Sequence, residues 1–256
     1  MKQLLPIFVC LFAAAAAAAP AHDEAAARQR YDGCLNEAHT NPAGALGNAE
    51  DWHRHDGGVP ASHCAALALV GLKRYAEAAG ELDALARGTG IASGAMRSEL
   101  LDQAGNAWLL AGQPSNSDAS FSEALALSSG DPDLFADLAR AKAIEKDWKA
   151  AEADLNAALD IDPGRPDLLV LRASARHAAG RKAQARADID QVLQSHPDFP
   201  DALVERGELK LDAGDVAGAR ADWQRTIATA PHSGAADEAR KHIADMDAAA
   251  AKAKPH

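Results

Sequence analysis

Aromatic residues, cysteines and blocks of basic residues are all scarce in this chain of 256 residues. Phe, Trp and Tyr make up 4% of it, which argues against a β-sandwich, because strands are enriched in aromatic residues. The 26 Lys+Arg form no basic block and are outnumbered by 37 Asp+Glu, giving a net charge of -11. Sequence-independent nucleic-acid binding and attachment to anionic membranes both depend on clustered Lys and Arg, so the charge argues against both. What is present is an alanine-rich composition, which predicts an all-helical, soluble chain.

The first 21 residues are predicted to be a secretory signal peptide. Lys2 precedes an apolar stretch at residues 4–19, which is short for a bilayer-spanning helix of about 20 residues. The small residues Ala19 and Ala21 then offer an A-x-A cleavage site. The alternative is an uncleaved N-terminal anchor. We expect an exported, periplasmic protein with no membrane span after cleavage.

Removal of Cys10 with the signal peptide leaves Cys34 and Cys64. Two cysteines in an exported chain predict one disulfide. It would close a loop of about 31 residues and stabilise the fold by roughly 3 to 4 kcal/mol on chain-entropy grounds. The alternative is two separately buried thiols, since helical cores accept cysteine as a small apolar residue.

Beyond residue 98 the sequence repeats at a spacing of about 34 residues, which predicts a solenoid of helix pairs. Prolines beside Asp predict the start of each first helix, glycines its end, and later prolines the end of each second helix. A small alanine and then a large apolar residue recur on the second helix, where they predict close helix packing around a core. These columns are Pro132-Asp133, Pro166-Asp167 and Pro200-Asp201; Gly112, Gly180 and Gly214, with Lys146 in the remaining place; Ala151, Ala185 and Ala219; Phe121, Leu155, Ile189 and Trp223; and Pro163, Pro197 and Pro231.

This pattern resembles the tetratricopeptide repeat (TPR) family, whose unit is an antiparallel helix pair with small residues at positions 8 and 20 and proline at position 32. Position 8 falls on Gly105, Ala139, Ala173 and Gly207; position 20 on Ser117, Ala151, Ala185 and Ala219; position 27 on Ala124, Ala158, Val192 and Thr226; and position 32 on Ser129, Pro163, Pro197 and Pro231. Ser129 and Lys146 depart from the pattern. The resemblance implies an all-α, right-handed α-solenoid with units at 98–131, 132–165, 166–199 and 200–233.

Further helices are predicted on both sides of these four units. Another TPR-like unit is expected at 59–92, a degenerate N-terminal helix pair at 22–58, a capping helix at 234–247 and a disordered tail at 248–256. A short insertion is expected near residues 89–94, where two glycines indicate a loop. Cys34 and Cys64 would lie on neighbouring first helices in a TPR stack, so a disulfide would staple the N-terminal end.

Catalytic motifs are not found in the sequence, which contains no nucleophile elbow, no phosphate-loop lysine motif and no His-Glu-x-x-His. We therefore expect a chain that is not an enzyme, with no catalytic residues and no cofactor. His53, His55 and His63 are a weak alternative metal site beside Cys64, because imidazoles and a thiolate bind zinc or copper. A disulfide would consume Cys64, and no metal is expected.

The TPR resemblance implies a concave face lined by the first helix of every unit, with positions 2, 5, 9 and 12 facing a partner. These groove candidates are Glu99, Asp102, Asn106, Leu109, Asp133, Ala136, Arg140, Ala143, Asp167, Val170, Ser174, His177, Asp201, Val204, Glu208 and Leu211. These positions predict a groove with acidic residues at its rim and apolar residues inside it. Some TPR grooves clamp the terminal carboxylate of a peptide with Lys, Asn and Arg at such positions. Among the groove candidates here, only Asn106 fits that set. The rim instead predicts a partner with basic residues beside an apolar anchor.

The expected function is a scaffold or adaptor that binds a protein or peptide of unknown identity in the bacterial periplasm. Two alternatives remain: an accessory subunit of an exported enzyme or envelope assembly machine, and a metal-binding carrier that uses the N-terminal histidines. Because TPR arrays serve many roles, the fold alone does not choose among them.

Overall fold

The computed structural model describes residues 21–252, with side chains from residue 25 on. These residues form thirteen α-helices and no strand, which confirms the predicted all-α class. The helices are α1 (Ala21–Thr40), α2 (Pro42–Arg54), α3 (Gly58–Gly71), α4 (Tyr75–Arg87), α5 (Gly94–Leu110), α6 (Pro114–Leu127), α7 (Pro132–Ile144), α8 (Trp148–Ile161), α9 (Pro166–Ala178), α10 (Lys182–Ser195), α11 (Pro200–Asp212), α12 (Val216–Thr229) and α13 (Gly234–Lys252). The predicted signal peptide lies outside the described residues apart from Ala21, and so do residues 253–256 of the predicted tail.

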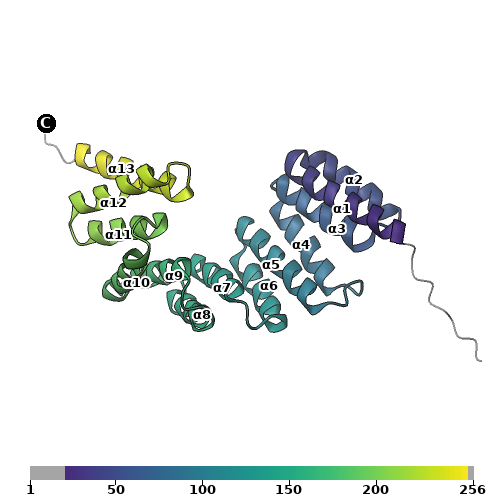
Figure 1. The fold of residues 1–256 in the computed structure, drawn as a ribbon, viewed down its shortest axis with the longest axis horizontal. Helices are drawn as coiled ribbons and strands as arrows, with labels where there is room; N and C mark the ends of the chain where they lie inside the picture. Colours follow the sequence, from purple (N-terminus) through teal and green to yellow (C-terminus); the bar gives the residue numbers. More distant parts are fainter. Residues whose placement is uncertain (1–20, 253–256) are drawn as a thin grey trace, which may run out of the picture.

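The helix pairs stack into an open arc with two arms, which confirms the predicted α-solenoid (Figure 1). Each helix packs against the next one along the chain, and α5, α7, α9, α11 and α13 also contact one another in that order. Figure 1 shows α7 and α9 on the inner side of the arc, with α6, α8 and α10 on the outer side. The first helices of successive units therefore form its concave face. No helix of the described part is both long and apolar enough to cross a membrane.

The predicted helix starts and turns are confirmed. Proline opens α7, α9 and α11, where the first turn has no intrahelical partner for an N–H. The turn glycines Gly112, Gly180 and Gly214 have φ of 70°, 79° and 84°, in the left-handed region. Lys146, at the same place in the 132–165 unit, has φ of 64°. The turn therefore imposes one conformation whichever residue occupies it.

The large residues of the second helices form the core. Phe121, Ile189 and Trp223 are fully buried, and Leu155 is 2% exposed. The two aromatic rings lie against the two glycines at position 8: a Cβ on Gly105 would stand 2.5 Å from Phe121, and one on Gly207 would stand 2.3 Å from Trp223. Units with Leu155 or Ile189 carry alanine at position 8 instead. Residue size at position 8 thus follows the size of its partner.

Two helix limits differ from the predicted ones. α5 begins at Gly94, about one turn ahead of the predicted unit start at residue 98, so the inserted residues divide between a loop and extra helix. α13 continues to Lys252 instead of ending at 247, because its last turns are mostly alanine, the strongest helix former. At the other end a disulfide joins Cys34 on α1 to Cys64 on α3, with their Cα atoms 6.1 Å apart.

Candidate functional site

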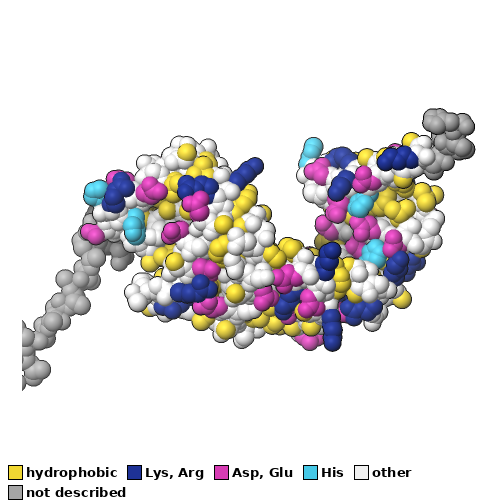
Figure 2. All heavy atoms as spheres, turned by 180° about the vertical axis from the view of Figure 1, so that it is seen from behind, with side chains coloured by type: hydrophobic (Ala, Val, Ile, Leu, Met, Phe, Trp, Pro, Cys, Tyr) yellow, Lys and Arg dark blue, Asp and Glu magenta, His cyan; other side chains and the backbone are white. Residues whose placement is uncertain are grey.

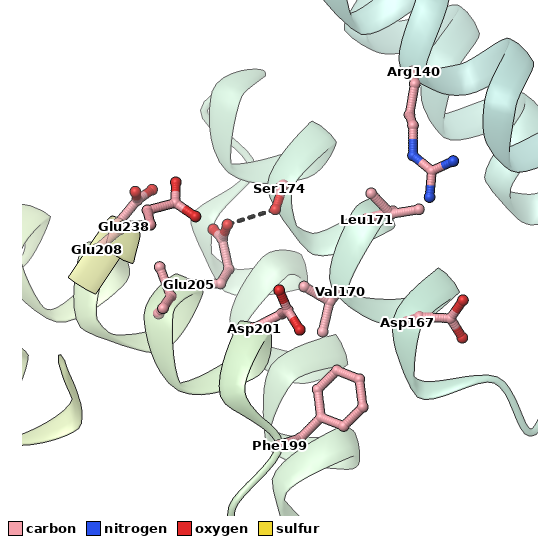
Figure 3. A pocket seen from close by; sticks show the side chains of 11 residues that line it. Arg140, Asp167, Val170, Leu171, Ser174, Phe199, Asp201, Glu205, Glu208 and Glu238 are labelled. Atoms are coloured by element: carbon pink, nitrogen blue, oxygen red, sulfur yellow. Dashed lines mark hydrogen bonds between the residues drawn. The ribbon is translucent and has the colours of Figure 1, made fainter. Parts of the chain in front are cut away.

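A cavity of about 530 Å³ lies on the concave side between α7, α9, α11 and α13; we call it the acidic cavity. Seven of the sixteen groove candidates line it: Arg140, Asp167, Val170, Ser174, Asp201, Val204 and Glu208. Leu171, Phe199, Glu205 and Glu238 complete the lining (Figure 3). The resemblance-based positions therefore locate the cavity, and the structure adds four residues that they missed.

The acidic cavity combines apolar and carboxylate side chains. Val170, Leu171, Val204 and Phe199 supply apolar surface, and Asp167, Asp201, Glu205, Glu208 and Glu238 supply five carboxylates. Arg140 is the one basic side chain in the lining, and it is paired with Asp137. In Figure 3, Arg140 and Asp167 lie on one side of the cavity, and Glu208 and Glu238 on the other.

Three aspartates were expected at the acidic rim, Asp133, Asp167 and Asp201, and an arginine neutralises two of them. Arg165 binds two of the three rim aspartates, with Nη2 2.8 Å from Asp133 Oδ1 and 2.6 Å from Asp167 Oδ2. Hydrogen bonding to Arg165 lowers the pKa of Asp167. Asp201 forms no ion pair among the described residues. Negative charge is therefore concentrated toward α11 and α13, where Figure 2 shows acidic and histidine side chains on the inner wall of one arm.

Glu205 and Glu208 lie one turn apart on α11 at the centre of this charge. Glu205 is 6% exposed and accepts a hydrogen bond from the Ser174 hydroxyl. Burial and the nearby Glu205 carboxylate raise the pKa of Glu208. Because two carboxylates this close repel each other, they favour the binding of a cation between them.

His177, a groove candidate, lies beside these carboxylates. Its Nδ1 is 2.8 Å from Glu205 Oε1, and its Nε2 is 3.0 Å from Asp212 Oδ2. Burial lowers the pKa of His177, but the hydrogen bonds to Asp212 and Glu205 outweigh that effect and raise it. From α13, His242 Nε2 lies 2.8 Å from Glu208 Oε1.

One sequence feature could have identified two residues of this site. Glu205, beside the groove candidate Val204, is recognised only from its contact with Ser174 of α9. Counting the repeat onward from residue 234 places Glu238 at position 5 and His242 at position 9 of α13. The helix predicted only to cap the stack therefore also contributes a wall of the cavity.

The remaining groove candidates lie elsewhere. Glu99, Asp102 and Asp133 line a separate hollow of about 300 Å³, and Ala136 and Ala143 line an apolar one of about 250 Å³. The Asn106 amide donates to the side chains of Asp102 and Asp137. Leu109 packs against the core, and Leu211 is exposed outside all three hollows. The sixteen positions thus divide among several surfaces.

The N-terminal histidines are not brought together. His63 contacts the Tyr31 hydroxyl and Gln103, His53 contacts Ser62, and His55 contacts the Asp51 backbone. Within the described chain, these three histidines do not share a group of ligand atoms. Cys64 is used in the disulfide. The weak alternative metal site is therefore not assembled.

Comparison with known proteins supports the repeat assignment. Residues 142–202 match the tetratricopeptide repeat family model. A TPR protein from Parabacteroides merdae is 17% identical with a TM-score of 0.62, covering 86% of this chain and 86% of that chain. A thermophilic TPR protein from Thermus thermophilus is 18% identical with a TM-score of 0.57, covering 70% and 94%. YrrB, "a TPR protein with an unusual peptide-binding site", is 17% identical with a TM-score of 0.50, covering 75% and 96%.

No curated protein sequence matches the chain. At these identities the solved structures establish the fold, and the family model assigns the repeats. TPR proteins are generally non-catalytic scaffolds for protein–protein interaction. Residues 142–202 thus match tetratricopeptide repeats, and the stacked helix pairs of the described chain have the fold of TPR proteins.

Proposed function

We propose that this protein is a non-enzymatic scaffold of the bacterial periplasm that binds a peptide or protein segment in the acidic cavity. The segment carries a Lys or Arg beside an apolar side chain. The observation that carries the proposal is the lining itself. Five carboxylates surround apolar side chains, only Asp167 among them is paired with an arginine, and Arg140 of the lining is already paired with Asp137.

Charge and burial support this choice of partner. A basic side chain relieves the repulsion between Glu205, Glu208 and Glu238, and an apolar neighbour covers Val170 and Phe199. Opposite charge across an interface contributes chiefly to specificity and association rate. A partner of this kind therefore binds more weakly as the salt concentration rises.

The proposed location has two supports. The N-terminal apolar stretch ending in small residues is typical of a cleaved export signal. The Cys34–Cys64 disulfide is of the kind that persists in the oxidising periplasm. Sequencing the N-terminus of the protein isolated from an envelope fraction tests this, since export with cleavage predicts a start near residue 22.

A peptide-binding assay with single variants tests the cavity. The probes are short peptides with one Lys or Arg beside Leu or Phe, and matched peptides with Glu in place of the basic residue. Asp201→Lys should weaken binding of the basic peptides at least tenfold, because it places a cation at the mouth of the cavity. Asp160→Lys, an exposed change on α8, is the control and should leave binding unchanged. Equal binding by Asp201→Lys and the unaltered protein would reject the cavity as the site.

A further inference from the structure

We propose that the wall of the acidic cavity formed by α9 and α11 is a site for a divalent transition-metal ion, with Zn²⁺ as the reference ion. Its ligands are His177, Glu205 and Glu208. This goes beyond the proposed scaffold function and does not depend on it, although both use Glu205 and Glu208. An imidazole with two carboxylates is a donor set that zinc accepts.

The donor atoms already converge. One ligand atom from each of His177, Glu205 and Glu208 lies within 4.8 Å of the others. His177 Nδ1 is 2.8 Å from Glu205 Oε1 and 4.0 Å from Glu208 Oε2. Donors held at about 2.0 to 2.2 Å from one ion stand roughly 3 to 3.5 Å apart, so these separations bracket the required spacing. A small rotation of the Glu208 side chain brings its carboxylate to the distance from His177 that a shared ion requires.

The outer contacts match those that orient metal ligands. His177 Nε2 faces Asp212, whose carboxylate is held by Lys182 Nζ at 2.7 Å. A metal-bound histidine usually gives its other N–H to a carboxylate, which fixes the ring and leaves the first nitrogen free to bind. Glu205 is held in the same way by the Ser174 hydroxyl. In the absence of a metal, a proton on Nδ1 fills the same place, so metal and proton compete.

α13 supports the site through Glu208. The His242 ring stacks on Trp223, with centroids 4.9 Å apart and an interplanar angle of 13°, so its orientation is set by the core. Its buried Nε2 lies 2.8 Å from Glu208 Oε1, yet the two atoms are not aligned as a hydrogen bond and this nitrogen makes none within the described chain. Glu208, Glu238 and His242 form a second group of potential donors that shares Glu208. We assign His242 a positioning role on the carboxylate that binds the ion.

Calorimetric titration of the purified protein with Zn²⁺, without any peptide, tests the site. We expect one tight equivalent at pH 7.5, binding that weakens on lowering the pH to 6, and a rise in melting temperature with added zinc. His177→Gln should weaken this equivalent at least tenfold, and His242→Gln should weaken it less. His232→Gln, which changes an exposed histidine in the loop before α13, is the matched control and should bind as the unaltered protein does.

Melting curves without zinc check that each variant is folded. Glu208→Gln is a second test variant, which removes a carboxylate ligand and keeps His177. The proposal is overturned if the protein binds no tight equivalent, or if His177→Gln and Glu208→Gln both retain it. Loss in His242→Gln with full retention in His177→Gln would also overturn the assigned ligands. Because no peptide is present, none of these results bears on the scaffold function.

Discussion

At the scale of single residues, Lys146 has the backbone conformation that glycine takes at the equivalent turns. Its φ of 64° costs a residue with a Cβ about 1 to 2 kcal/mol. Lys146→Gly should therefore stabilise the protein by about 0.5 to 1 kcal/mol, after allowing for the greater freedom of glycine in the unfolded chain. Urea unfolding measures the change. Lys149→Gly, an exposed change inside α8, should instead lower stability slightly, and equal effects of the two variants would contradict the turn argument.

Gly207 is required for a different reason, because the Trp223 ring leaves no room for a side chain at this position. Alanine is the better helix former, but its Cβ would stand 2.3 Å from Trp223 Nε1. Gly207→Ala should therefore destabilise the protein by about 1 to 3 kcal/mol. Gly47→Ala is the control, since Gly47 is exposed on α2 with no atom near its Cβ position, and should stabilise by a fraction of a kcal/mol. A stabilised Gly207→Ala variant would show that the Trp223 ring can move aside.

Asp102 makes stability depend on pH. Burial and the neighbouring Asp137 raise its pKa from the ordinary 3.8 to about 7. Between these values the folded protein holds more protons than the unfolded chain, so stability falls as the pH rises through this window. Asp102→Asn should melt higher than the unaltered protein at pH 8, with the difference vanishing near pH 4. The control is Asp160→Asn, at an exposed site, which should change the melting temperature by the same small amount at both pH values. If Asp102→Asn behaves like this control, the pKa of Asp102 is not raised.

At the scale of secondary-structure elements, the disulfide ties α1 to α3 at the end of the stack that lacks a neighbour on one side. Replacing both Cys34 and Cys64 by Ala should lower the free energy of unfolding by roughly 3 to 4 kcal/mol. A reductant should destabilise the unaltered protein by the same amount and leave the double variant unchanged. Absence of any reductant effect on the unaltered protein would mean that the thiols are free.

The sequence predicted the repeated helices well because their limits are set by local chemistry. Pro132, Pro166 and Pro200 open helices, and a glycine predicts the turn after the first helix in three units. Lys146, a departure from the pattern, takes the same conformation in the fourth. The start of α5 at Gly94 and the end of α13 at Lys252 were not predicted. The first lies where the repeat is interrupted and the second where it has ended, so no repeated residue indicates either helix limit.

The candidate site was predicted in part, since the family positions give the helix face but not the side-chain pairing. Asp133 and Asp167 lie on the expected face, yet Arg165 neutralises them. Glu205 and Glu238 were missed, although both line the acidic cavity. Ion pairs between helices depend on side-chain geometry across units, and a single sequence does not supply it.

At the scale of the whole molecule, the arc concentrates negative charge on one part of its concave face. Successive first helices bring carboxylates of α9, α11 and α13 around one cavity, although these residues are distant in sequence. Figure 2 shows the hollow between the two arms, with acidic and histidine side chains on the inner wall of one arm. We expect a long partner to contact both arms while its basic residue enters the acidic cavity.

Site-specific photocrosslinking in the envelope fraction tests whether the acidic cavity binds the proposed partner. A photoreactive residue replaces Leu171 in the acidic cavity, and in a matched variant it replaces Ile161, an exposed residue at the end of α8. We expect a crosslink from position 171 to a segment with Lys or Arg beside an apolar residue, and we expect it to be lost when Asp201→Lys is added. Crosslinks that form equally from position 161, or that persist with Asp201→Lys, would contradict the proposal.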